Sequence, residues 1–415
     1  MTSPEQIATE VDAWLDENWS PDITVAEWWS RLAKARYGMP TLPEPWGRGY
    51  TREQGRAVSG ALRRHGALGP PAGVGVSLTL PTLLVHGTDE QHERYIPGIL
   101  NGTEGWCQLF SEPGAGSDLA GLQTRAVRDG DEWVINGQKV WTSTGHLADY
   151  GILIARTDPD VPKHQGITYF LFPMRQPGVE VRPLREMTGE AIFNEVFFDD
   201  ARVRDADRLG DLNAGWMVAN TTLTYERTGI GDNEGGFARA APGTISGHLQ
   251  KRTADLLARP TTRSAGGGVG PGTVNRLTQL ARDLGLSGDP VVRQELARLH
   301  TELQLVRMTD LRLKAGGVRT GGEGNLAKLR MTALVRRARN VASLVGGPHA
   351  QVEGPGDLTD GWLSSFIVAS PAPSIYGGTD EVQRNIIGER VLGLPKEPSS
   401  DRTLPFRELL VNATR

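Results

Sequence analysis

Cysteine is almost absent from this sequence, and so is any cluster of metal-binding side chains. Cys107 is the only cysteine among 415 residues, which excludes an intramolecular disulfide framework and a thiolate metal cluster and is typical of a reducing compartment. The 8 histidines do not fall at the spacings that metal ligands usually show, so we expect no metal site.

Long apolar runs are also missing. The longest uncharged stretch, around residues 68–88, contains Pro70, Pro71 and Pro81 together with several glycines. This mixture is typical of buried helices interrupted by prolines and not of a membrane span. The N-terminal residues MTSPEQIATEVDAWLDENW are acidic and lack the basic end and apolar run of a secretory signal. We therefore expect a cytoplasmic protein that does not cross a membrane.

No strong charge of either sign is present. The formal net charge is −4 and the sequence pI is about 6.1, so the basic surface of a nucleic-acid-binding protein is not indicated. Common nucleotide and hydrolase motifs are lacking too. GVG at 73–75 and GAG at 114–116 do not complete the G-x-G-x-x-G fingerprint between a strand and a helix, and neither a G-K-[ST] phosphate loop nor a G-x-S-x-G elbow occurs.

The apolar pattern divides the chain into helical, β-rich and helical regions. A chain of 415 residues is expected to form two or three packed units. Helical spacing dominates up to about residue 104, and from 105 the period changes to two. Asn136-Gly137 gives the strongest short hairpin signal in the β-rich region. Helical spacing returns from 215, interrupted by a glycine-rich stretch at 264–273 that predicts a loop. We expect an α+β fold with domains at 1–104, 105–214 and 215–415.

The densest motif is CQLFSEPGAGSDLAG at 107–121. Its Pro-Gly-Ala-Gly core predicts a tight turn whose backbone N–H groups let a planar or anionic ligand approach closely. The segment KVWTSTG follows at 139–145, and IYGGTDEVQRNIIGER stands at 375–390.

These three segments resemble, in the expected order, the signatures of the acyl-CoA dehydrogenases, and the resemblance covers nearly the whole chain. It implies an N-terminal α-helical domain, a central β-barrel domain, a C-terminal helical bundle and an FAD cofactor. Residues that the resemblance assigns to FAD are Gln108, Phe110, Ser111, Gly116, Ser117, Trp141, Thr142, Ser143, Thr379, Asp380 and Glu381. The residues that it assigns to the substrate are Ser117, Arg227 and Gly378.

The catalytic base is not where many members of the family carry it. Medium-chain enzymes have a glutamate directly before the Gly-Thr of the C-terminal signature, and this chain has Gly377 there. Branches resembling the long-chain and isovaleryl enzymes place the glutamate on the first helix after the β-domain, immediately before an arginine. Glu226-Arg227 stands at that place, so the resemblance implies Glu226 as the base.

The implied reaction is α,β-dehydrogenation of an acyl-CoA to a trans-2-enoyl-CoA. The hydrogen next to a thioester is weakly acidic, so its removal requires a positioned base, worth roughly 10²–10⁴ in rate. The family polarises the thioester carbonyl with a backbone N–H and a ribityl hydroxyl of the flavin. Gly377 leaves room where relatives have a carboxylate, which favours a branched, long or bulky acyl group.

Other positions depart from the family pattern. In the stretches that contact the neighbouring subunit's flavin, Leu284 replaces a phenylalanine, Ser343 replaces a glutamine, and Arg282 is the candidate for the usual arginine. On the CoA side, Thr224 replaces an acid and Glu389 replaces an arginine.

The resemblance implies an electron-transfer flavoprotein as electron acceptor and a homotetramer built as a dimer of dimers. Three alternatives stay open. An acyl-CoA oxidase or flavin monooxygenase would have the same fold but pass electrons to oxygen. The altered flavin contacts also fit a hetero-oligomer with a related subunit. In such an assembly, this chain could be a non-catalytic partner.

Overall fold

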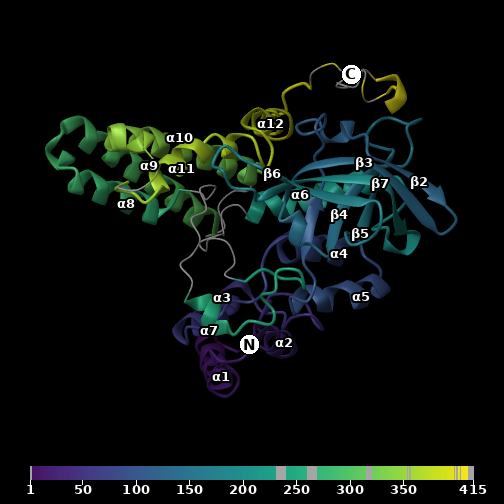
Figure 1. Ribbon diagram of the computed structural model, residues 1–415, viewed down its shortest axis with the longest axis horizontal. Helices are drawn as coiled ribbons and strands as arrows, with labels where there is room; N and C mark the ends of the chain where they lie inside the picture. Colours follow the sequence, from purple (N-terminus) through teal and green to yellow (C-terminus); the bar gives the residue numbers. More distant parts are fainter. Residues whose placement is uncertain are drawn as a thin grey trace.

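The computed structural model describes residues 2–229, 240–258, 269–314, 320–352, 354, 357–396, 398, 401 and 403–409. Of residues 227–229, 313 and 314 only the helical backbone is described. Figure 1 shows an N-terminal group of helices, a central β-sheet and a C-terminal group of helices that extends away from the sheet. The predicted α+β class and its helix, sheet, helix order are confirmed. The exact domain boundaries remain predictions.

Five α-helices precede the sheet: α1 (Pro4–Asn18), α2 (Val25–Ala35), α3 (Arg52–Arg64), α4 (Leu80–His86) and α5 (Asp89–Leu100). Hydroxyl caps close the first turns of α1, α2, α3 and α5, with complete capping boxes at Ser3, Thr51 and Thr88. A π-helical turn, Gly75–Thr79, runs directly into α4. Pro81 lies at the start of α4, directly after the π-helical turn. Leu78, Leu80 and Leu83 are buried, so this region is a buried helical segment as expected, but the helical run continues through Pro81.

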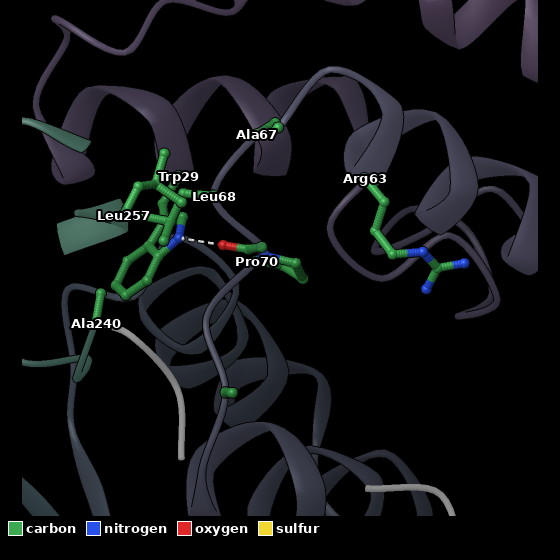
Figure 2. Close-up of a pocket in the computed structure, with 10 residues that line it drawn as sticks. Trp29, Arg63, Ala67, Leu68, Pro70, Ala240 and Leu257 are labelled. Carbon is green, nitrogen blue, oxygen red and sulfur yellow. Dashed lines mark hydrogen bonds between the residues drawn. The ribbon is translucent and has the colours of Figure 1, made fainter. Parts of the chain in front are cut away.

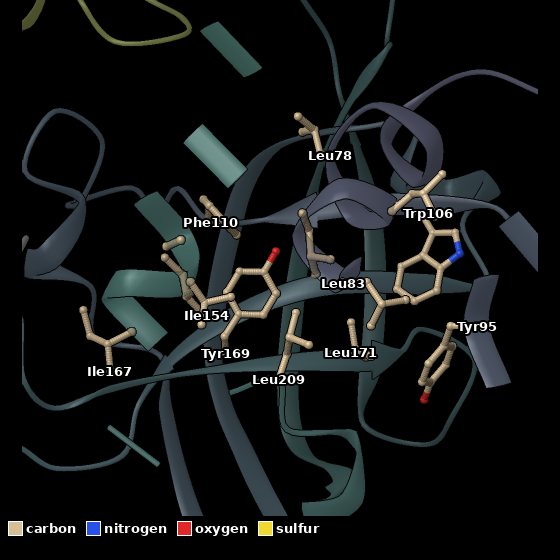
Figure 3. Packing of buried hydrophobic residues seen from close by; sticks show 14 of the residues in the cluster. Leu78, Leu83, Tyr95, Trp106, Phe110, Ile154, Ile167, Tyr169, Leu171 and Leu209 are labelled. Carbon is tan, nitrogen blue, oxygen red and sulfur yellow. The ribbon is translucent and has the colours of Figure 1, made fainter. Parts of the chain in front are cut away.

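The central sheet has seven strands: β1 (Trp106–Leu109), β2 (Arg125–Asp129), β3 (Glu132–Ser143), β4 (Tyr150–Arg156), β5 (Ile167–Pro173), β6 (Val179–Leu184) and β7 (Phe193–Arg204). Their order is β1-β4-β2-β3-β7-β6, with β5 beside β4. Strand β1 runs parallel to β4, whereas β3 pairs with β2 and β7 in antiparallel fashion. Figure 3 shows the core between the sheet and helices α4 and α5, where Phe110, Tyr169 and Trp106 are buried.

The hairpin predicted at Asn136-Gly137 is wrong, because β3 continues through both residues. The turn lies six residues earlier, since β2 and β3 are joined around Gly130, which has φ +65°. Gly137 has φ +149°, and the β3–β7 register shifts at this point. The glycine is needed because a Cβ here would lie 2.7 Å from the Cα of Thr124. The glycine signal therefore marks a bulge with close backbone packing.

The C-terminal region contains α6 (Gly215–Gly229), α7 (Thr253–Leu257), α8 (Pro271–Asp283), α9 (Pro290–Lys314), α10 (Glu323–Gly346), α11 (Trp362–Ala369) and α12 (Asp380–Ile386). Helices α8 to α11 share one apolar core. Helix α6 instead packs against β5 and α4. The loop predicted at 264–273 lies largely outside the described residues, and its end was placed too late because Pro271 already begins α8.

The segment around α7 belongs by packing to the N-terminal helices. Leu249 and Leu256 are buried in the same core as Trp28. The backbone N–H of Ala26 donates to the carbonyl of Leu249 at 3.0 Å, and the N–H of Thr253 donates to the carbonyl of Ile23 at 3.0 Å. The N-terminal core is thus completed by residues more than 200 positions further along the chain.

Substituting Gly137 tests the bulge. Gly137→Ala is expected to destabilise the protein by about 3 kcal/mol, because the new Cβ would collide with the Thr124 backbone. Gly130→Ala is the matched control: Gly130 also has a positive φ but nothing lies within 4 Å of its Cβ position, so it should cost only about 1 kcal/mol. Denaturant unfolding measures both. Equal losses would contradict close packing at Gly137.

Candidate active site

The turn after β1 leaves its backbone open to a ligand. Glu112 and Ala115 exchange two backbone hydrogen bonds of 3.0 Å, which closes the turn. Gly116 and Ser117 follow on the surface, and no atom lies within 4 Å of the position that a Cβ on Gly116 would take. A planar or anionic group can therefore come close to this stretch of backbone, as the sequence predicted.

A buried ion pair joins this turn to β3. The Lys139 ammonium donates to a Glu112 carboxylate oxygen at 2.8 Å and to the carbonyl of Phe110 at 2.9 Å. The Glu112 carboxylate also accepts the backbone N–H groups of Gln123, at 2.6 Å, and Thr124, at 2.9 Å. Lys139 has 0% and Glu112 7% of its side chain exposed. The first two signature segments are thus held together by one charged contact.

Burial and charge oppose each other within this pair. Burial would raise the pKa of Glu112, but the Lys139 ammonium and the N–H donors of Thr124 and Gln123 hold it below its ordinary value. Burial lowers the pKa of Lys139, and Glu112 offsets part of that effect. The nearby guanidinium of Arg156 is also buried, and desolvation lowers its pKa to about 10. Removing either partner would therefore leave an uncompensated buried charge and lower the stability of the fold.

Trp141 follows two residues after Lys139, in an unusual backbone conformation. Its φ is +61°, and the β3–β7 register shifts between Lys139 and Thr142. The indole is 57% exposed, with the ring of Phe193 packed edge-on at a centroid distance of 5.7 Å. A positive φ in a bulky residue is rare and occurs at functional sites. The bulge turns a large aromatic face outward.

The neighbours of Trp141 differ in burial. Thr142 is fully buried, and its methyl lies 2.9 Å from the position that a Cβ on Gly145 would take, so its side chain packs into the β-domain. Ser143 is only half-buried. Of the three residues predicted to face the flavin ring, the geometry favours Trp141 and Ser143.

Hydroxyl groups fix α6 just before Glu226. Thr222 Oγ1 lies 3.0 Å from Thr82 Oγ1 and 3.0 Å from the Tyr169 hydroxyl, and all three residues are buried. One turn of helix separates Thr222 from Glu226. The position of Glu226 along α6 is therefore tied to both α4 and β5 by buried hydrogen bonds.

Glu226 points toward the strand that enters the open turn. The Gln108 side-chain amide on β1 contacts a Glu226 carboxylate oxygen at 3.5 Å, and Glu226 is half-buried. The structure thus brings together two residues that the sequence assigned separately, one to the cofactor and one to catalysis. The side chain of Arg227, predicted to contact the substrate, lies outside the described residues.

The C-terminal signature begins with two glycines in the left-handed region, Gly377 at φ +63° and Gly378 at φ +83°. Thr379 caps α12 by accepting the Val382 N–H at 3.2 Å. Asp380 is 2% exposed, with its oxygens bound by Thr332 at 2.9 Å and Arg336 at 2.8 Å.

The remaining predicted residues have varied surroundings. Phe110 is buried against the Tyr169 ring, and the Ser111 carbonyl accepts the Val140 N–H at 2.9 Å. Glu381 is exposed, 3.5 Å from Arg384.

Sequence reasoning missed Glu112 and Lys139, although a lysine in an alternating strand, two residues before a signature tryptophan, was a usable signal.

Two pockets on the described residues, of about 320 and 350 Å³, do not contain the signature residues. One lies among the N-terminal helices beside Trp29, Leu68 and Arg63, as Figure 2 shows. The other lies on α9 and α10 around Arg337.

Among the described residues, no group of three or more His, Cys, Asp or Glu side chains could hold a metal ion. No described helix is long and apolar enough to span a membrane.

The residues around the open turn fit a flavin. Trp141 offers an exposed aromatic face, Gly116 offers unobstructed backbone, and the serines beside them offer hydrogen bonds. Flavin-binding sites combine such an aromatic contact with polar groups at the ring edge.

Breaking the ion pair tests its role. Lys139→Met is expected to destabilise the protein by about 3–5 kcal/mol, because it leaves the Glu112 carboxylate buried without its cation. The bound FAD per protein should fall as well, since the turn loses its attachment to β3. Unfolding by denaturant and the visible absorbance of the purified protein measure these effects.

Two variants serve as controls for that experiment. Lys34→Met removes an exposed lysine and should change neither quantity. Glu112→Gln with Lys139→Met should be more stable than the sum of the two single losses, because neither position of the pair is left charged without its partner. Strictly additive losses would argue against a direct pair.

Three family models match this chain: the acyl-CoA dehydrogenase N-terminal domain over residues 3–103, the middle domain over 107–201 and the C-terminal domain over 257–392. The chain is 36% identical to acyl-CoA dehydrogenase IpdE1 of Mycobacterium tuberculosis, covering 96% of this chain and 99% of the relative. It is 37% identical to acyl-CoA dehydrogenase FadE34 of the same organism, covering 86% of this chain and 44% of that protein.

Solved structures agree. A protein titled Tcur3481-Tcur3483 steroid ACAD has a TM-score of 0.69 at 25% identity, covering 95% of this chain and 98% of that chain. The ChsE4-ChsE5 complex from Mycobacterium tuberculosis has a TM-score of 0.68 at 27% identity, covering 95% and 98%. The chain therefore belongs to the acyl-CoA dehydrogenase family of FAD-dependent oxidoreductases.

Proposed function

We propose that this protein dehydrogenates an acyl-CoA between its α and β carbons, with Glu226 as the base. The supporting observation is the place of Glu226: it is half-buried on a helix fixed by buried hydroxyls, and it contacts Gln108 of the strand leading to the open turn. Gly377 occupies the alternative position for the base, so one carboxylate carries this role.

The residues divide the work as follows. Glu226 takes the proton from the α carbon, while the β hydrogen leaves with its electron pair and the two carbons form a trans double bond. The backbone at Gly377-Gly378 binds the thioester carbonyl and stabilises the charge that develops on its oxygen. Gly116, Ser117, Trp141, Ser143 and Thr379 would hold FAD, which would supply the hydride acceptor when bound. Arg227 contributes to substrate binding.

We propose a bulky alicyclic acyl group as the substrate class. Gly377 leaves volume where other family members have a glutamate side chain. Two structural relatives are titled steroid ACAD. Two more relatives, 37% and 34% identical over about 40% of the chain, are named cyclohexane-1-carbonyl-CoA dehydrogenases.

We propose an electron-transfer flavoprotein as the acceptor and an oligomer as the working form. Helix α9 supports the oligomer because Leu305, Met308 and Leu311 are each more than half exposed at the three-residue spacing of one helix face. The ChsE4-ChsE5 structure is a complex of two different chains, which keeps a related partner subunit as the alternative to a homotetramer.

Replacing the base tests the proposal. Glu226→Gln should lower kcat by at least about 10²-fold, because the amide cannot accept the α proton. The measurement is anaerobic loss of visible flavin absorbance on adding an acyl-CoA. Glu53→Gln, an exposed position on α3, is the control and should keep full activity. Full activity in Glu226→Gln would refute the base assignment.

An assay in air, with an acyl-CoA and an electron-accepting dye, separates dehydrogenase from oxidase. Reduction of a dye without hydrogen peroxide supports a dehydrogenase, whereas peroxide formed at a comparable rate in air identifies an oxidase.

A panel of acyl-CoA thioesters tests the substrate class. A thioester of a fused-ring carboxylic acid should have kcat/KM at least about 10-fold above that of a straight chain with equal carbon number, since added pocket contacts are worth roughly 1–3 kcal/mol. Gly377→Ala should reduce kcat/KM more for the ring thioester than for the straight one. A clear preference for straight chains would contradict the proposal.

A further inference from the structure

The part of the chain that follows α12 returns to the β-domain and lies against the loop between β4 and β5. Figure 1 shows it in yellow, passing from α12 toward the sheet. We call its described residues 401 and 403–409 the C-terminal segment. The backbone N–H groups of Phe406 and Arg407 donate to two carbonyls of the loop, Val161 at 2.9 Å and Pro159 at 3.0 Å. Backbone hydrogen bonds therefore fix the segment to this loop.

Phe406 covers a buried guanidinium. Phe406 is 8% and Arg156 is 4% exposed, and the Arg156 Cζ lies 3.7 Å from the centroid of the Phe406 ring. The same guanidinium donates to the carbonyls of Ala120 at 2.6 Å and Leu122 at 3.3 Å. An aromatic face stabilises a guanidinium most when water is excluded. Phe406 thus supports the cation that holds the backbone directly after the signature turn.

Asp401 reaches the signature turn by a second route, through Lys163. The Lys163 ammonium lies 2.5 Å from an Asp401 oxygen and 2.8 Å from an Asp118 oxygen, and its side chain is 8% exposed. Burial would lower the pKa of Lys163, but the two carboxylates raise it above its ordinary value. Asp118 follows Ser117 directly. Asp401 therefore shares one cation with the residue next to Ser117.

The backbone from the signature turn to β2 is held at three places. The Lys163 ammonium holds its start, the Arg156 guanidinium holds its middle, and the Glu112 carboxylate holds its far end. A ligand binds more tightly to a segment that is already fixed in its bound shape, because less freedom is lost on binding. Two of the three anchors also contact the C-terminal segment.

We propose that Phe406 and Asp401 are positioning residues for FAD: they complete the contacts of Arg156 and Lys163, and so keep the Gly116-Ser117 backbone in the shape that the cofactor needs. This inference rests on the proposed function, which assigns Gly116 and Ser117 to FAD. The cofactor turn thus depends on a part of the chain that comes after the whole C-terminal group of helices.

Release of FAD tests the role of Phe406. Phe406→Ala should raise the FAD dissociation constant at least about 5-fold, because the uncovered guanidinium holds the backbone after the turn less firmly. Phe406→Tyr keeps the aromatic face and should stay within about 2-fold of the wild type. The FAD-loaded, full-length protein is diluted, and the fluorescence of the released flavin gives the constant.

Arg407→Gln is the matched control in the same segment. Arg407 pairs with Asp160 of the loop, and both side chains are more than half exposed. Among the described residues, no observed contact joins Arg407 to Arg156 or Lys163. An exposed ion pair is worth little, so the FAD dissociation constant should not change. Equal rises in Arg407→Gln and Phe406→Ala would overturn the specific role of Phe406.

A double-mutant cycle tests the route through Lys163. Asp401→Asn should raise the FAD dissociation constant about 3-fold, the effect expected of a partly exposed ion pair. In a Lys163→Met background, the same substitution should have no further effect, because Asp401 acts through the ammonium. Asp401→Glu keeps the charge and should restore most of the affinity. Equal effects of Asp401→Asn in both backgrounds would refute this route.

Hydrogen exchange gives a readout that needs no substrate. In the full-length protein, the amides of residues 114–122 should exchange faster in Phe406→Ala than in the wild type, whereas those of α9 should keep their rate. An increase of equal size in both regions would refute a positioning role, because it would show general destabilisation. Unchanged exchange at 114–122 would refute it as well.

The outcomes separate the two proposals. If Glu226→Gln is inactive while Phe406→Ala and Asp401→Asn hold FAD as the wild type does, the roles of Phe406 and Asp401 are refuted and the proposed function stands. If Glu226→Gln keeps full activity, the base assignment fails, and the FAD dissociation constants still decide the roles of Phe406 and Asp401.

Discussion

The contact between Glu112 and Lys139 holds the cofactor region of this protein together. It joins the open turn after β1 to the strand that carries Trp141, and both carry signature segments of the family. Because both groups are buried, breaking the pair would leave a buried charge without its counter-ion. The exposed indole and the unobstructed backbone at Gly116 therefore keep a defined spacing without any direct contact between them.

Helix α6, which carries Glu226, is positioned by a different kind of contact. The Thr222 hydroxyl on α6 contacts the hydroxyls of Thr82 on α4 and Tyr169 on β5. One residue of α6 therefore connects this helix to both the N-terminal helices and the sheet. Glu226 thus lies where α6 meets the N-terminal helices and the sheet, and both contribute a polar contact on or near it. Such convergence suits a group that has to be held accurately against a substrate.

Much of this arrangement was readable in the sequence. The change of apolar period from helix to strand and back predicted the fold class, and three short motifs predicted the family. The family resemblance pointed to Glu226 through its place on the first helix after the sheet, and its role as base stays a prediction. These signals are local, and they depend on residue type and spacing along one element.

What escaped prediction depends on contacts between distant segments. Asn136-Gly137 looked like a hairpin, but the glycine is required by the backbone of Thr124, which no local pattern reveals. No local pattern names a carboxylate partner for Lys139 or Lys328, and only the folded chain brings Glu112 and Asp380 to them. The burial of Thr142 follows from the bulge at Trp141, which is a property of strand pairing and not of residue order.

The packing of Leu249 and Leu256 into the N-terminal core has a consequence for how the chain acquires its structure. The first helices cannot complete their interior until about residue 257 has left the ribosome, because the missing wall of that interior is encoded downstream of the entire sheet. During synthesis, Trp28 and its neighbours must therefore stay partly exposed to solvent while the strands assemble. A truncated chain ending after the sheet would expose that apolar surface permanently.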